Sequence, residues 1–212
     1  MFASIKNIIS PKSVQAINGA IYDYVKISIF MTLYSLPWTI VNLVFKFSEK
    51  TYIFYALAFL FVVPNLVTLL QVFDKENISF KDYSALLRAG YQKKFLLGVV
   101  LVAVISFCLT DTYILMELMQ LNWLFPLLYI SLMFIVVASI YSLLFFQTET
   151  SWQEVIKKAV FFSWRYSFRT LCIFLLLMLW LSIGYFLQGL NFIFGNALFW
   201  GIIYRLASKK IN

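Results

Sequence analysis

The sequence predicts an all-α membrane protein: a polytopic helix bundle of about six transmembrane helices with two cytoplasmic amphipathic helices. Three observations predict this class. Hydrophobic residues make up 63% of the 212 residues, whereas soluble domains hold roughly 45–50%. Charged residues make up only 12%, and they cluster between long apolar runs. Most of these runs approach the roughly 20 residues that a helix needs to cross a bilayer.

The apolar runs make the whole chain, residues 1–212, a single membrane domain. It opens with an N-terminal segment over residues 1–20 and closes with the last span and a tail over residues 190–212. The last run is short and interrupted by Gly195, Asn196 and Gly201. This run can cross the membrane fully, or it can form a re-entrant or interfacial segment. The expected spans cover residues 24–45, 52–73, 95–112, 121–146, 168–188 and 190–206.

Basic residues fall almost entirely on alternate connections between the spans. If the N-terminus is cytoplasmic, all of the 17 Lys and Arg residues except Lys46 and Lys50 fall on the cytoplasmic side. Positive charge is retained on that side of a membrane. We therefore expect a multi-pass protein of the cytoplasmic membrane with both termini cytoplasmic, which requires an even number of spans. Asp111 and Glu117, in an outer connection, are interpreted as solvated loop acids.

Two amphipathic segments, "SFKDYSALLRAGYQKK" and "SWQEVIKKAVFFSWRY", separate these spans. Each opens with the serine and acid of a capping box, Ser79 with Asp82 and Ser151 with Glu154. Apolar residues then recur with helical spacing along one face. The order of span, amphipathic helix and span thus occurs twice, over residues 52–112 and 121–188. Duplication and convergent use of one design both remain open as its origin.

The sequence resembles the YesL-like family of bacterial membrane proteins. The resemblance runs from about Ile21 to Arg205 and is carried by "YSLPWTIVN", "PNLVTLLQVF", "FKDYSALLRAGYQKKF" and "ETSWQEVIKKAVFFSWRYSFRTLCIFLL". The chain departs from the family after Pro37, where Trp38 follows in place of a Thr-Ile-Gly-type turn. The resemblance implies a setting in operons for uptake and breakdown of complex sugars, often beside ABC-importer genes. It implies no particular reaction.

A polar stripe marks the first two spans. The residues of the first span are spaced to share one helical face, and those of the second follow Pro64. The stripe can line a substrate path or a partner-facing groove. It can also form hydrogen bonds between helices, which is the interpretation that we favour. Its members are Ser28, Thr32, Ser35, Thr39, Asn42, Asn65 and Thr68.

The apolar faces of the two amphipathic segments are the candidate interaction surfaces. They can lie in the lipid headgroup layer, with basic residues toward anionic lipid. Alternatively, they can dock on a partner protein, for which exposed aromatic residues are typical anchors. The candidate docking residues are Phe80, Tyr83, Leu87, Tyr91, Trp152, Val155 and Ile156.

The composition argues against an enzyme. The chain has no histidine, the commonest general base and metal ligand, and we expect no catalytic, cofactor or metal site. Because the basic residues flank the spans, we expect them to contact membrane lipid rather than nucleic acid. Combined with the resemblance, this predicts a non-enzymatic accessory protein that associates with permease or ATPase subunits of a carbohydrate ABC importer. The alternatives are a substrate-binding subunit similar to those of energy-coupling-factor transporters and a cell-envelope polymer assembly factor.

The predicted topology can be tested by cysteine-accessibility labelling of intact cells. Cysteines introduced at Ser48 and Thr112 should be labelled by an impermeant reagent, because both positions are expected outside. A cysteine at Ser208 should remain unlabelled. Labelling at Ser208 would contradict the sixth span.

Overall fold

The computed structural model describes residues 11–46, 48, 50–73, 75, 78–120, 122–146, 151–186 and 196–208. Every regular element in these ranges is helical, which confirms the predicted all-α class. The α-helices are α2 (Pro11–Tyr34), α3 (Leu36–Val44), α4 (Tyr52–Val72), α5 (Phe80–Arg88), α6 (Tyr91–Tyr113), α7 (Phe125–Phe145), α8 (Trp152–Arg165), α9 (Ser167–Phe186) and α11 (Asn196–Ser208). Two short turns, π-helical Ile114–Leu118 and 3-10-helical Asn122–Leu124, lie between α6 and α7.

Within the described ranges, four helices are long and apolar enough to cross a membrane: α4, α6, α7 and α9. The bent pair α2 and α3 makes a fifth if it is counted as one span. Helix α11 has 13 residues and is roughly 20 Å long, shorter than a hydrocarbon core of about 30 Å. Part of the expected sixth span, residues 190–195, lies outside the described ranges. The described residues therefore hold four or five candidate spans, and the count of six stays a prediction.

The first span is broken rather than continuous. The described part of α2 and helix α3 meet at an angle of 81° around Ser35, and Pro37 lies in the first turn of α3. Proline has no N–H to continue the hydrogen bonding of α2, but it fits the start of a new helix. The expectation that the polar stripe follows one uninterrupted helical face is therefore wrong. Its first residues lie on α2 and its last ones on α3.

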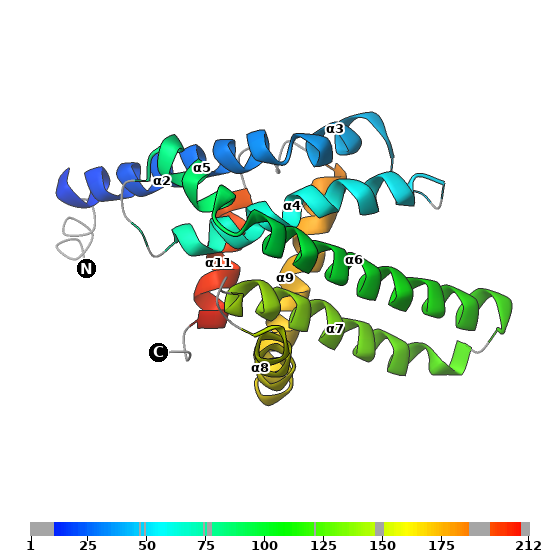
Figure 1. Ribbon diagram of the computed structural model, residues 1–212. Coiled ribbons are helices and arrows are strands. Elements are labelled where there is room, and N and C mark those ends of the chain that lie inside the picture. The colour runs from blue at the N-terminus through cyan, green and yellow to red at the C-terminus, as the bar shows by residue number, and fades with distance from the viewer. Residues whose placement is uncertain are drawn as a thin grey trace.

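Helix α4 is the centre of the fold. Most of its membrane-length segment is buried, whereas α6, α7 and α9 are largely exposed. Helix α6 packs closely along α4, because Gly98 leaves room for it: a Cβ there would lie 3.2 Å from Cβ of Val63. Figure 1 shows α6 and α7 running side by side, with α9 and α11 crossing these long helices. Helix α11 contacts α2, α4 and α9.

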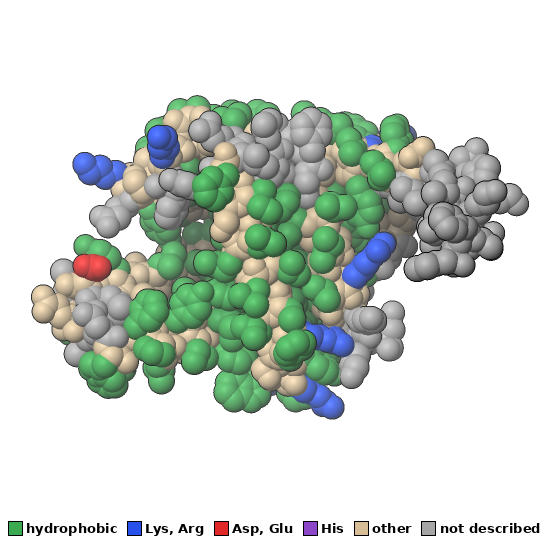
Figure 2. All heavy atoms as spheres, turned by 180° about the vertical axis from the view of Figure 1, so that it is seen from behind, with side chains coloured by type: hydrophobic (Ala, Val, Ile, Leu, Met, Phe, Trp, Pro, Cys, Tyr) green, Lys and Arg blue, Asp and Glu red, His purple; other side chains and the backbone are tan. Residues whose placement is uncertain are grey.

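Two ends of the bundle can be distinguished. The α3–α4 and α6–α7 connections lie at one end of the long helices, and the start of α2 and the end of α11 lie toward the other (Figure 1). Figure 2 shows a face made largely of hydrophobic side chains, with few charged ones. This distribution suits a bilayer. Which end faces the cytoplasm stays a prediction.

The same order of elements occurs twice, as α4–α5–α6 and α7–α8–α9, but the two units pack differently. The first passes from α5 into α6 through Gly90, whose φ of 66° is left-handed and favours glycine. The second passes from α8 into α9 through Tyr166, with φ of −113°. Helix α6 packs on α4, whereas α7 packs chiefly on α8. The tandem repeat stays a prediction, and duplication and convergence both remain open as its origin.

The two predicted capping boxes have different outcomes. At α5 the box is formed: the Asp82 N–H donates to Ser79 Oγ, and the Asp82 carboxylate accepts from the Ser79 N–H, both at 3.2 Å. At α8 the prediction is wrong, because Ser151 occupies the cap position without a side-chain cap hydrogen bond. The Glu154 N–H there donates to the Ser151 carbonyl at 3.1 Å instead. The amide that the hydroxyl would satisfy already has a backbone acceptor.

The two serines form a matched pair for stability measurements in detergent. Ser79→Ala should lower the free energy of unfolding by about 0.5–2 kcal/mol, the usual cost of a lost cap, whereas Ser151→Ala should change it little. The hydrogen bonds from Ser79 also lower the pKa of the Asp82 carboxyl below its ordinary value. Its contribution is therefore present above the unfolded pKa and lost as the pH falls through the folded pKa. Equal effects of the two substitutions at neutral pH would contradict the assignment.

Candidate functional site: a buried polar cluster beneath helix α5

A hydrogen-bonded cluster around Asn65 joins α2, α4 and α5. The Asn65 side-chain amide donates from Nδ2 to the Met31 carbonyl at 2.6 Å and to Ser35 Oγ at 2.7 Å. The Tyr83 hydroxyl donates to Asn65 Oδ1. The Met31 carbonyl lies in the last turn of α2 and also accepts from the Ser35 N–H at 2.9 Å. Asn65 thus fixes the end of α2 and the underside of α5 at one point of α4.

Tyr83 is the part of α5 that enters this cluster. Its side chain is 0% exposed, and its ring stacks on Tyr34 with centroids 5.8 Å apart and lies 5.7 Å from the ring of Phe30. Burial raises the pKa of the Tyr83 phenol far above its ordinary value. The hydroxyl therefore remains protonated and can serve as the donor to Asn65 at any physiological pH.

A second anchor of α5 is Lys94, near the start of α6. Its side chain is only 1% exposed, although lysine is rarely buried. The ammonium donates to the Leu86 carbonyl at 2.6 Å, to Thr68 Oγ1 at 3.0 Å and to Gln71 Oε1 at 3.4 Å. Leu86 lies in the last turn of α5, where the helix dipole favours a positive charge. Lys94 thus holds the end of α5 against α4.

The residues of the polar stripe divide into two groups. Ser35, Asn65 and Thr68 belong to the hydrogen-bonded network around α4. Ser28 also makes a contact between helices, because its hydroxyl accepts from the Ala197 N–H at the start of α11, at 2.9 Å. The other three donate to carbonyl groups four residues earlier: Thr32 to Ser28, Thr39 to Ser35 and Asn42 to Trp38.

The candidate docking residues also divide. Tyr83, Leu87 and Val155 are buried, so the prediction that they are available to a partner is wrong in this structure. The reason is that the inner faces of α5 and α8 pack on helices of the same chain. Trp152 is half-buried, and its ring packs against Phe146. The exposed members are Phe80, Tyr91 and Ile156.

Sequence reasoning missed Lys94, which was counted only among the basic residues that flank a span. A signal for its burial is nevertheless present. Lys94, Leu97, Gly98 and Leu101 follow the spacing of one helical face, and all four are buried. A lysine in register with an apolar helical face indicates an ammonium that needs partners inside the protein.

The comparisons with known proteins add no relative: no family model, no curated protein and no solved structure matches the chain. The functional argument therefore rests on the geometry. The cluster supplies an amide, hydroxyl groups and one ammonium, and its principal hydrogen bonds are made within the chain. Such an arrangement can hold α5 rigidly against α2 and α4.

Tyr83→Phe tests this anchoring role. The variant keeps the ring but leaves the buried Asn65 oxygen without the phenolic donor, which should cost about 1–3 kcal/mol of unfolding free energy. Thermal unfolding in detergent measures the loss. Tyr91→Phe removes the hydroxyl of an exposed tyrosine and should be neutral. An unchanged melting temperature for Tyr83→Phe would contradict the role of the cluster.

Proposed function

We propose that the protein is a non-enzymatic accessory component of the cytoplasmic membrane that docks another membrane protein through the outer face of α5. This proposal rests on one observation: two buried side chains hold the inner side of α5. Tyr83 ties the helix to Asn65, and Lys94 ties its last turn to α4. A surface that is held in place before binding loses less conformational entropy when a partner binds.

The outer face of α5 has the composition of a water-exposed contact surface. Lys81, Ala85 and Arg88 are exposed and share one side of the helix. Phe80, at the first turn, is 48% exposed while its ring stacks on Tyr34 with centroids 5.6 Å apart. The face therefore combines a fixed aromatic edge, a small central residue and a basic rim. Aromatic anchors supply affinity, whereas rim charges mainly affect association rate and orientation.

The proposed partner is a permease or ATPase subunit of a carbohydrate ABC importer. This part of the proposal rests on the resemblance to the YesL-like family, whose members are set beside such importers. The basic rim of α5 favours an acidic contact surface on that partner. The partner would meet α5 on the cytoplasmic side, where the distribution of Lys and Arg residues predicts both inserts to lie.

Purification from native membranes in mild detergent, followed by mass spectrometry, tests the proposal. Wild-type protein should retain importer subunits. Ala85→Trp, which places a bulky ring at the centre of the outer face without touching the anchored side, should lose them. Lys81→Gln is the matched control on the rim and should retain them. Normal membrane insertion and an unchanged melting temperature for both variants would show that the fold is intact.

Two results would contradict the proposal. Ala85→Trp could retain the partner as well as wild type does. Alternatively, wild-type protein could purify alone with a bound small molecule, which would favour the substrate-binding subunit instead. Tyr83→Ala is unsuitable as a docking test, because removal of this buried ring would disturb the fold itself.

A further inference from the structure

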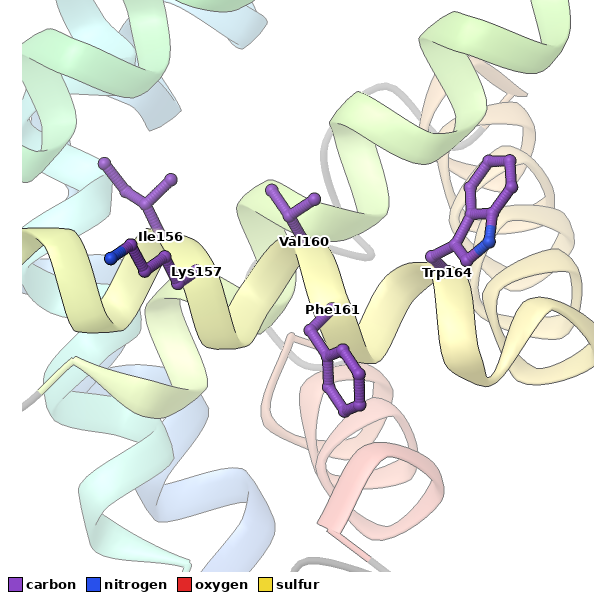
Figure 3. Close-up of a pocket in the computed structure, with 5 residues that line it drawn as sticks. All are labelled: Ile156, Lys157, Val160, Phe161 and Trp164. Carbon is purple, nitrogen blue, oxygen red and sulfur yellow. The ribbon is translucent and has the colours of Figure 1, made fainter.

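Helix α8 differs from α5 because several large apolar side chains remain exposed on its outward face, beside basic ones. Its inner face, formed by Val155, Ala159 and Ser163, is buried and packs on α7. Large side chains remain on the outside, and Ile156, Lys157, Val160, Phe161 and Trp164 form an open, shallow surface along the helix. Figure 3 shows Val160 and Trp164 projecting from one side of α8 and Phe161 from the other.

Two large aromatic side chains on the outward face of α8 are mostly exposed. Phe161 is 52% exposed and Trp164 is 72% exposed. The Trp164 ring packs on Phe134 of α7, with ring centroids 5.1 Å apart. Helix α7 is one of the candidate spans, and its exposed side faces lipid when it crosses the membrane. The outward face of α8 is therefore continuous with a lipid-facing surface.

Positive charge accompanies this apolar face. Lys157, Lys158 and Arg165 are exposed on α8, and Glu154 is the acidic residue of the helix. The Arg165 guanidinium lies over the Phe161 ring at 5.4 Å and near the Tyr166 ring at 5.9 Å. These contacts hold the cation beside the aromatic surface, where it can pair with a phosphate group.

The direction of α8 is also consistent with an interfacial position. Figure 1 shows α8 end-on while α7 runs across the view, so α8 crosses α7 steeply. Such a crossing is compatible with an orientation along the membrane surface, and the 14 residues of α8 are too few to cross a hydrocarbon core. An apolar, aromatic face with flanking cations is the composition of helices that lie at the boundary of headgroups and acyl chains.

We infer that α8 is an interfacial helix that binds anionic phospholipid. Phe161 and Trp164 enter the boundary with the acyl chains, and Lys157, Lys158 and Arg165 pair with lipid phosphate groups. The inference is independent of the proposed docking function, because that function uses α5. It assigns opposite environments to the two amphipathic helices: water and a protein partner for α5, lipid for α8.

Tryptophan quenching by brominated lipid tests the inference on the full chain. The protein is reconstituted into vesicles of phosphatidylcholine, alone or mixed with phosphatidylglycerol, with bromine on the acyl chains of one lipid at a time. The contribution of Trp164 is the difference between wild type and Trp164→Phe. We expect this contribution to be quenched, and more strongly by brominated phosphatidylglycerol than by brominated phosphatidylcholine at equal content.

The charge requirement is tested in the same vesicles. Lys157→Gln, Lys158→Gln and Arg165→Gln should each lower the preference for phosphatidylglycerol by about fivefold at low salt, the usual effect of one basic side chain near an anionic surface. High salt should reduce the preference of the wild type. Lys81→Gln on α5 is the control and should leave it unchanged.

Two outcomes would overturn the inference. If neither brominated lipid quenches the Trp164 contribution, the face is covered by protein, such as a partner or a second copy of the chain. If both lipids quench it equally and the three substitutions have no effect, α8 contacts lipid without selecting anionic headgroups.

Discussion

The side-chain hydrogen bonds of Asn65 are the interaction on which the arrangement of the other helices depends. Inside a bilayer no water is present to satisfy a polar group, so a buried amide requires partners from the protein. Asn65 finds them in the Met31 carbonyl, the Ser35 hydroxyl and the Tyr83 hydroxyl. Two of these partners, Met31 and Ser35, lie where α2 ends and the chain bends. The third, Tyr83, belongs to α5 and holds that helix in place.

The central position of α4 follows from the same requirement. Besides Asn65 it carries Thr68, which donates to the Pro64 carbonyl and accepts from the Lys94 ammonium. A helix whose polar residues need partners from several neighbours must be surrounded by them. Gly98 on α6 permits this close approach. The polar residues of α4 therefore explain its burial better than its hydrophobicity does, because α7 is also strongly apolar and yet largely exposed.

The sequence pattern predicted the helices well where one physical cause dominates. Continuous apolar composition located α4 at Tyr52–Val72, close to the expected 52–73. The pattern did not predict the break of the first span or its 81° bend, because tertiary contacts such as Asn65 to Ser35 accompany the bend. Nor could it distinguish the caps at Ser79 and Ser151, which share one pattern but differ in which acceptor satisfies the first free amide. Lys94 was missed because two patterns predict opposite environments for it. The clustering of basic residues beside the spans places it at the membrane surface, whereas the apolar face of its helix places it inside the protein.

The contrast between α5 and α8 shows why amphipathic periodicity alone does not identify what covers a helix. In α5 the large side chains Tyr83 and Leu87 face inward, so the hydrophobic area of the helix is satisfied by its own chain. In α8 the inward side chains include the small residues Ala159 and Ser163, and Phe161 and Trp164 remain outside. Burial of such side chains contributes roughly 25 cal/mol per Å² of apolar area. Much of this area on α8 is not covered by the described residues, and the flanking cations favour an anionic bilayer surface as its environment.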